Sequence, residues 1–140
     1  MIAYFDSSAL VKLVVDEPGS DEAAALWDGA DAVVASRITH PEVCAALAAA
    51  ARGGRIAEAD REHAFEQWDG YRQGLRLVEL TADVEQRAGT LAARHALGGL
   101  DAIHLASALL LGAEVTVMAT WDLRLRTGAA EAGLTTFPAH

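Results

Sequence analysis

The stretch that decides the fold is the opening Ile2-Ala3-Tyr4-Phe5-Asp6-Ser7-Ser8-Ala9-Leu10. Its first four residues form an unbroken apolar run, which predicts a buried strand over 2–5 that ends at Asp6. Residues 7–15 carry the three- and four-residue spacing of a helix, and Glu17-Pro18-Gly19 interrupts it. A buried strand that passes directly into a helix is typical of a parallel sheet covered by helices.

The same alternation of short apolar runs and helical segments continues along the chain. Further strands are expected at 32–35, 75–80, 114–119 and 134–137. Further helices are expected at 21–29, 41–52, 57–72, 81–97, 101–111 and 122–133. The pattern predicts the α/β class, a parallel sheet between two layers of helices, and one domain over 1–140.

Composition and charge narrow the classes of protein. The chain has 140 residues and a net charge of -9, which argues against tight non-specific binding to duplex DNA, since such proteins carry a basic surface. Clustered acids can instead hold cations, which in turn hold phosphate. The single Cys44 excludes an internal disulfide and fits a reducing compartment. No apolar run resembles a signal peptide or a membrane span, so we expect a cytoplasmic protein.

Four carboxylates stand where chemistry is expected in a parallel sheet, beyond the carboxyl ends of the strands. Asp6 and Asp122 follow predicted strands, Glu42 follows the second strand by a short turn, and Asp101 opens a helix after Gly98-Gly99. Two carboxylates about 4 Å apart repel by roughly 4 kcal/mol at a dielectric near 20, so a cluster requires a counter-charge. Oxygen ligands select Mg²⁺ or Mn²⁺, which activate water for phosphodiester hydrolysis.

Each acid also has a structural interpretation. Asp6, Asp101 and Asp122 could simply start helices, because the helix dipole favours acids there. Thr39 and Glu42 have the spacing of a capping box. On local context alone, a structural role is the more common one for each acid.

Several other residues are candidates for supporting roles. Ser7 and Thr120 flank two acids and could orient them or cap helices. His104 lies one turn after Asp101 and is either a buried, satisfied histidine or a support for the site. Trp121 could stack on a base or pack at a strand end. The candidates for contact with substrate phosphate are Lys12, Arg37 and Arg124.

Four segments, in order, resemble the PIN-domain ribonucleases of the VapC toxin type. They are Ile2-Ala3-Tyr4-Phe5-Asp6-Ser7-Ser8-Ala9-Leu10-Val11-Lys12-Leu13, Pro41-Glu42-Val43-Cys44-Ala45-Ala46-Leu47, Gly99-Leu100-Asp101-Ala102-Ile103-His104-Leu105-Ala106-Ser107-Ala108 and Thr120-Trp121-Asp122-Leu123-Arg124-Leu125. The order and spacing agree over essentially the whole chain. Pro41 before the glutamate and the bulky Trp121 are mild departures, and neither removes an acid.

The resemblance implies a three-layer α/β/α fold whose parallel sheet has the order 3-2-1-4-5. It implies an Mg²⁺- or Mn²⁺-dependent endoribonuclease that forms a homodimer and is blocked by a co-encoded antitoxin. On the matching positions, the metal-binding and catalytic acids become Asp6, Glu42, Asp101 and Asp122, with Ser7 and Thr120 as their supports.

Two other functions compete with this interpretation. A haloacid-dehalogenase-like phosphatase would need a second acid at Ser8, and a receiver domain would need its acceptor after strand three, where Leu80-Thr81 stands. A catalytically silent interaction module of the same fold would be expected to have lost an acid, and none is missing.

The aromatic residues of the 57–72 helix suggest an interface. Phe65, Trp68 and Tyr71 form one stripe, and the helix forms a hairpin with the one before it. If part of this stripe stays exposed, the hairpin becomes the expected dimer surface, with an antitoxin segment nearby that reaches a basic side chain toward the acids.

Overall fold

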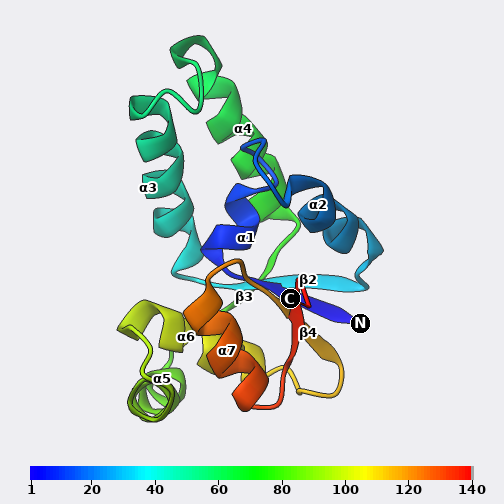
Figure 1. The fold of residues 1–140 in the computed structure, drawn as a ribbon, viewed down its shortest axis with the longest axis vertical. Coiled ribbons are helices and arrows are strands. Elements are labelled where there is room, and N and C mark those ends of the chain that lie inside the picture. The colour runs from blue at the N-terminus through cyan, green and yellow to red at the C-terminus, as the bar shows by residue number, and fades with distance from the viewer. Residues whose placement is uncertain (140) are drawn as a thin grey trace.

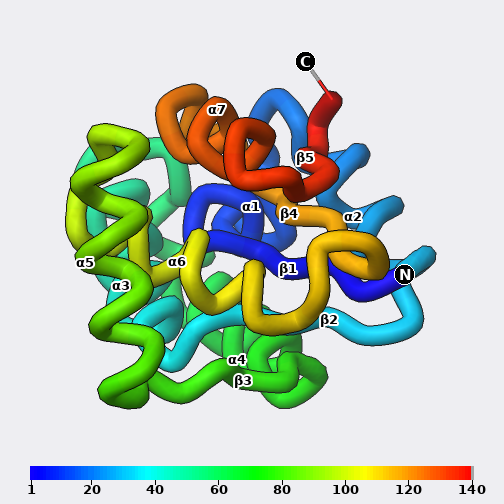
Figure 2. The backbone as a smooth tube through the Cα atoms, turned by 90° about the horizontal axis from the view of Figure 1, so that it is seen from below, coloured from blue at the N-terminus to red at the C-terminus, as the bar shows by residue number. Residues whose placement is uncertain are grey.

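A computed structural model describes residues 1–139, and its centre is a five-stranded parallel sheet. The strands are β1 (Ile2–Phe5), β2 (Ala32–Ser36), β3 (Arg76–Val78), β4 (Thr116–Ala119) and β5 (Thr135–Phe137). Their order is β3-β2-β1-β4-β5, and every pairing is parallel. Figure 2 shows the strands side by side in this order. The predicted sheet and its strand order are confirmed.

Helices cover both faces of the sheet, as Figure 1 shows. One layer contains α1 (Ser7–Val11), α2 (Ser20–Gly29), α3 (Thr39–Arg52), the short 3-10 turn η1 (Glu58–Asp60) and α4 (Arg61–Gln73). The other layer contains α5 (Ala82–His95), α6 (Gly99–Leu109) and α7 (Leu123–Glu131). This is the predicted three-layer α/β/α arrangement.

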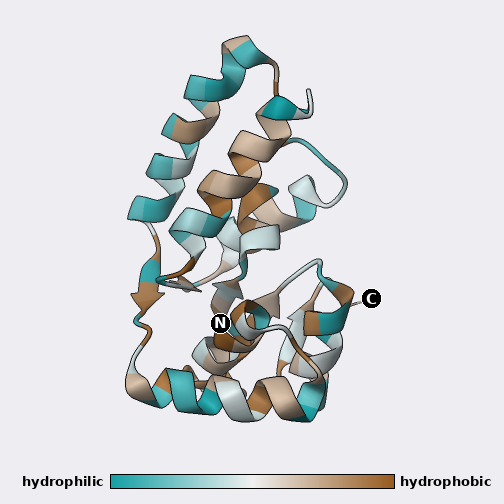
Figure 3. Ribbon diagram, turned by 90° about the vertical axis from the view of Figure 1, so that its left-hand side faces the viewer, coloured by the Kyte–Doolittle hydropathy of each residue, from teal (hydrophilic) through white to brown (hydrophobic). Residues whose placement is uncertain are grey.

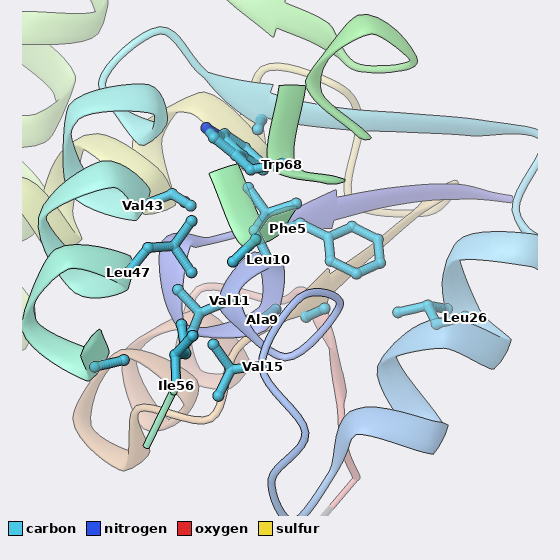
Figure 4. Packing of buried hydrophobic residues seen from close by; sticks show 14 of the residues in the cluster. Phe5, Ala9, Leu10, Val11, Val15, Leu26, Val43, Leu47, Ile56 and Trp68 are labelled. Atoms are coloured by element: carbon cyan, nitrogen blue, oxygen red, sulfur yellow. The ribbon is translucent and has the colours of Figure 1, made fainter. Parts of the chain in front are cut away.

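The central strand β1 feeds both halves of the core. Successive strand side chains point to opposite faces, so Ala3 and Phe5 join the cluster under α1–α4, whereas Tyr4 joins the cluster under α5–α7. Figure 4 shows Phe5, Leu10 and Trp68 packed together in the first cluster. A strand buried on both faces explains the continuous apolar run at the start of the chain.

Several elements differ in length from their predicted bounds. The first helix ends at Val11 rather than at residue 15. The amides of Leu13 and Val14 donate to carbonyls three residues earlier, which forms turns in place of a further helical turn. β3 and β4 are shorter than predicted, since only the central residues of the predicted 75–80 strand and the last four residues of the predicted 114–119 strand pair with neighbouring strands. α6 begins at Gly99, two residues earlier than expected, so Asp101 lies inside its first turn and does not cap it.

The α3–α4 hairpin buries its aromatic stripe only in part. Trp68 is 1% exposed, and Phe65 and Tyr71 pack against the chain's own core. Figure 3 shows α4 largely hydrophilic beside the more hydrophobic α3. The large exposed apolar side chains of residues 1–139 lie in other elements. Part of the stripe stays at the surface, and the dimer surface on this hairpin remains a prediction. Within the described residues, no helix has the length and apolar character needed to cross a membrane.

Candidate active site

Asp6 sits at the carboxyl end of β1 and caps α1. Its Oδ1 accepts hydrogen bonds from Ala9 N (2.9 Å) and Ser8 Oγ (2.6 Å), and its Oδ2 accepts one from Thr120 Oγ1 (2.5 Å). The side chain is buried, and burial raises its pKa although these donors and His104 act in the opposite direction. Asp6 is thus both a helix cap and a buried acid that a nearby cation would stabilise.

Glu42 is held by two donors from different elements. Ser7 Oγ lies 2.6 Å and His104 Nε2 lies 2.8 Å from the same oxygen, Oε1. Burial raises the pKa of Glu42, but the bonds from His104 and Ser7 outweigh it, so the net pKa lies below the usual range. The capping box is absent: Ile38 stands at the N-cap, and the Thr39 hydroxyl donates to the Ser36 carbonyl.

His104 connects Glu42 to the buried centre of the sheet. It is 1% exposed, and its Nδ1 lies 2.7 Å from the hydroxyl of Tyr4. Burial, followed by the charge of Asp6, raises the pKa of Tyr4 well above its usual value, so the phenol keeps its proton and can share it in a hydrogen bond to Nδ1. The imidazole proton then lies on Nε2 and faces Glu42. His104 is both buried and a direct support of an acid.

Asp122 and Asp101 form the open half of the site. Asp122 caps α7 by accepting from Leu125 N at 3.0 Å, and its own N–H donates to Thr120 Oγ1 at 3.1 Å. Asp101 is half-buried, and no hydrogen bond from residues 1–139 contributes to its pKa. Burial is the main cause that raises this pKa, and the charges of Asp122, Asp6 and Glu42 raise it further. The other three predicted acids therefore lie close enough to Asp101 for their charges to affect its pKa.

The chemical type of the candidate ligand atoms fits a hard divalent cation. All four acids offer carboxylate oxygens, the ligands that Mg²⁺ and Mn²⁺ prefer. Among residues 1–139 no hydrogen bond contributes to the pKa of Asp101, which burial raises first and the neighbouring carboxylates raise further. Within the part of the chain that the structure describes, however, no three His, Cys, Asp or Glu side chains already form a group that could hold a metal ion.

The supporting hydroxyls are partly as predicted. Thr120 supports Asp6, whereas Ser7 supports Glu42 and not the adjacent Asp6. Ser8 was missed as a support: its Oγ donates to Asp6 and accepts from Trp121 N at 3.0 Å. A serine two residues into a helix that is capped by aspartate would have been the signal for it.

The predicted phosphate contacts are scattered. Lys12 lines a pocket beside Asp122, as does Arg55, which the sequence did not single out. Arg37 forms an exposed bidentate pair with Glu79 and lines a different pocket. Arg124 is exposed on α7, two residues after Asp122.

Comparison with known proteins identifies the fold family. A model of the PIN domain matches residues 3–129. Ribonuclease VapC45 of Mycobacterium tuberculosis is 54% identical over 99% of this chain and 96% of that protein. The crystal structure of PAE2754 from Pyrobaculum aerophilum has a TM-score of 0.73 at 18% identity and covers 97% of this chain and 89% of its own. VapBC2 from Rickettsia felis, bound to a promoter DNA fragment, has a TM-score of 0.66 at 15% identity and covers 97% of both chains.

The two structures of low sequence identity show only a shared fold. The similarity to Ribonuclease VapC45 shows family membership, because more than half of the residues are identical over nearly the whole length of both chains. The four acids and their supports stand within or directly beside the matched range. The chain therefore belongs to the PIN-domain family, and within that family to the VapC ribonucleases.

Proposed function

We propose that this protein is a metal-dependent endoribonuclease and the toxin of a toxin–antitoxin pair, which hydrolyses phosphodiester bonds in RNA. The observation that carries the proposal is the shared charge of Asp6, Glu42, Asp101 and Asp122 at one edge of the sheet. Relatives that are 54% identical over nearly the full chain are named as ribonucleases, which supports the same activity here.

Asp6, Glu42, Asp101 and Asp122 would hold Mg²⁺ or Mn²⁺. A divalent cation bound there supplies an activated water and neutralises charge on the leaving oxygen. The chain's own contribution is to hold two of the acids in place before any ligand arrives. Ser8, Thr120 and the Ala9 amide fix Asp6, and Ser7 with His104 fixes Glu42.

The cations around the site are assigned to the substrate. Lys12 lines the pocket beside Asp122, and Arg124 lies on α7, so both would be candidates for contact with RNA phosphates; Lys12 would first have to leave Glu17 and the Pro18 carbonyl. Arg37 would have to leave Glu79 to do so, and it is the weakest of the three candidates.

The partner assignments rest on the family. A co-encoded antitoxin would block the site by pairing a basic side chain with the acids, a contact that bidentate arginine makes well. The likeness to VapBC2 and to VapBC-1 of nontypeable Haemophilus influenzae supports such a partner. We also expect a homodimer and a cytoplasmic location. Light scattering that gives a monomer of 14.7 kDa at high micromolar concentration would contradict the dimer.

The competing functions have less support. A haloacid-dehalogenase-like phosphatase would need an acid at position 8, and Ser8 instead donates to Asp6. A silent module would be expected to lack part of the acid set, whereas Asp6, Glu42, Asp101 and Asp122 are all present.

The test is cleavage of total cellular RNA with Mn²⁺, with the cut ends mapped. Asp6→Asn and Asp101→Asn should lose cleavage while staying folded, because each substitution removes one charge with little change in shape. Asp83→Asn is the matched control, since Asp83 also stands in the first turn of a helix, α5, but is exposed and pairs with the exposed Arg87. Cleavage at the parent rate by the Asp6 and Asp101 variants would refute the carboxylate mechanism.

A further inference from the structure

A pocket of about 340 Å³ opens directly beside the acids. Asp122 forms one wall, and Ser7 and Ser8, which hold Glu42 and Asp6, also line it. The remaining walls include an aromatic ring and two cations: Trp121, Lys12 and Arg55. The volume is at the small end of the range for ligand pockets, roughly 300–1,000 Å³, which suits one nucleotide better than a longer segment.

The indole of Trp121 is fixed from several sides. Lys12 Nζ lies 5.1 Å from the ring centroid, and Phe137 meets the ring edge-on at 6.0 Å between centroids. Gly19 has φ +96°, and a Cβ there would lie 2.7 Å from the indole Nε1, so only glycine lets the ring approach this closely. An aromatic ring held this firmly beside a catalytic acid is a ready surface for a base.

The two cations differ in freedom. Lys12 is 10% exposed and is held by Glu17 Oε1 at 3.0 Å and by the carbonyl of Pro18 at 2.7 Å. Arg55 is 57% exposed, and its guanidinium lies 3.6 Å from Glu17 Oε2. Lys12 therefore stabilises the position of Trp121, whereas Arg55 can exchange a loose, solvent-screened contact for a stronger anion.

We infer that this pocket binds one nucleotide of the RNA next to the cleaved bond, with its base against Trp121 and its phosphate paired with Arg55. The inference rests on the proposed function and adds where the substrate is read. The lining favours a nucleotide over a peptide segment, because an aromatic ring that a base can stack on and the loosely paired guanidinium of Arg55 lie in the same pocket. A planar guanidinium also suits phosphate geometry.

The experiment uses a pool of single-stranded RNA 12-mers with randomised sequence, Mn²⁺, and sequencing of the cut ends. Trp121→Ala should raise KM about tenfold or more, change kcat much less, and flatten the base preference at a position next to the cut. Trp121→Phe should restore most of that preference. Leu123→Ala is the matched control, because Leu123 is 71% exposed at the start of α7 and is not among the residues that line the pocket.

Arg55→Gln should raise KM and make the logarithmic salt dependence of KM shallower by about 0.7, the value for one lost phosphate contact on a single strand. Arg61→Gln is its control, since Arg61 is 51% exposed, pairs at 4.0 Å with Glu58 and does not line the pocket. Both pocket variants are also made in the Asp6→Asn background, where fluorescence anisotropy of a labelled 12-mer measures binding without cleavage.

The outcomes separate the two proposals. A parent that binds the 12-mer through Trp121 and Arg55 but never cuts it would overturn the proposed nuclease and keep the pocket. A parent that cuts RNA while the Trp121 and Arg55 variants keep its KM, salt dependence and base preference would overturn the pocket and keep the nuclease. If those variants weaken only the complex with the co-encoded antitoxin, the pocket belongs to that protein and the assignment to RNA is wrong.

Discussion

The two halves of the acid site are built differently. Asp6 and Glu42 each accept hydrogen bonds from at least two side chains or amides, and both contact residues in the sheet or in the helices packed on it. Asp101 and Asp122 lie at helix starts on the more open side. Asp122 accepts a hydrogen bond from one amide, and within residues 1–139 no hydrogen bond contributes to the pKa of Asp101. The fold therefore holds the first, fixed half with more hydrogen bonds than the second, open half.

The register of the sheet explains the fixed half. β1 and β4 pair with Phe5 opposite Ala119. The residues that directly follow these strands, Asp6 and Thr120, therefore meet beyond the same edge of the sheet. α6 joins the two halves, because His104 and Asp101 lie one turn apart on it. His104 contacts Glu42 in the first half, and Asp101 belongs to the second. A change in this helix should therefore affect one half more than the other.

The largest effect expected in the fixed half comes from His104→Gln. The variant removes the imidazole that donates to Glu42 and accepts from Tyr4, so RNA cleavage should fall about 10- to 100-fold, the usual cost of losing an outer support of a metal site. Tyr4→Phe keeps the imidazole and should cost less. The Mn²⁺ concentration for half-maximal cleavage should rise in both. A folded His104→Gln protein with parent rate and parent Mn²⁺ dependence would show that Glu42 needs no positioning.

A middle-sized effect is expected from Ser8→Ala. It leaves the buried Asp6 with one donor fewer and the Trp121 amide without its acceptor. We expect a loss of about 1–3 kcal/mol in the free energy of unfolding, measured with urea. The loss should be larger at pH 7 than at pH 4, because the missing bond favours the ionised acid. Thr127→Ala is the control, as its exposed hydroxyl donates to a carbonyl of its own helix and contacts no acid of the site. Equal losses for the two variants would contradict the role of Ser8.

The sequence predicted the positions of the acids better than the hydrogen-bond partners that hold them. The strand ends located Asp6 and Asp122, since strand periodicity and a following helix are local properties of the chain. The partner of each hydroxyl depends on which strands are neighbours and on helix rotation, which local patterns do not encode. Ser7 therefore turned out to serve Glu42, 35 residues away, and Ser8 was missed.

The aromatic stripe shows the same limit in packing. The spacing of Phe65, Trp68 and Tyr71 correctly predicted a helix with one apolar side. It could not say how much of that side the chain's own core would cover, because α3, α2 and the loops between them come from distant positions. Trp27 meets Tyr71 edge-on at 5.2 Å, a contact that no local pattern predicted.

The smallest effect, and the one of opposite sign in the two halves, concerns stability in metal-free protein. Burial and the charge of Asp122 raise the pKa of Asp101, so the folded state holds this proton more tightly than the unfolded chain does. Its contribution to stability is fully present below about pH 4, the unfolded value, and is lost as the pH rises through the raised folded pKa. Asp101→Asn removes that loss and should be more stable than the parent at pH 7, by at most about 1 kcal/mol because solvent screens a half-buried group.

Glu42→Gln is the counterpart in the fixed half. Despite its burial, the bonds from His104 and Ser7 lower the pKa of Glu42, so ionised Glu42 stabilises the fold above its unfolded pKa, and this contribution disappears as the pH falls through the lower folded value. Its glutamine variant should therefore be less stable than the parent at pH 7, and the difference should shrink toward acid pH. Urea unfolding in EDTA from pH 3 to pH 8 measures both. If the two variants shift stability in the same direction at pH 7, the two halves of the site do not differ as their hydrogen bonds indicate, and the open half is as well compensated without metal as the fixed one.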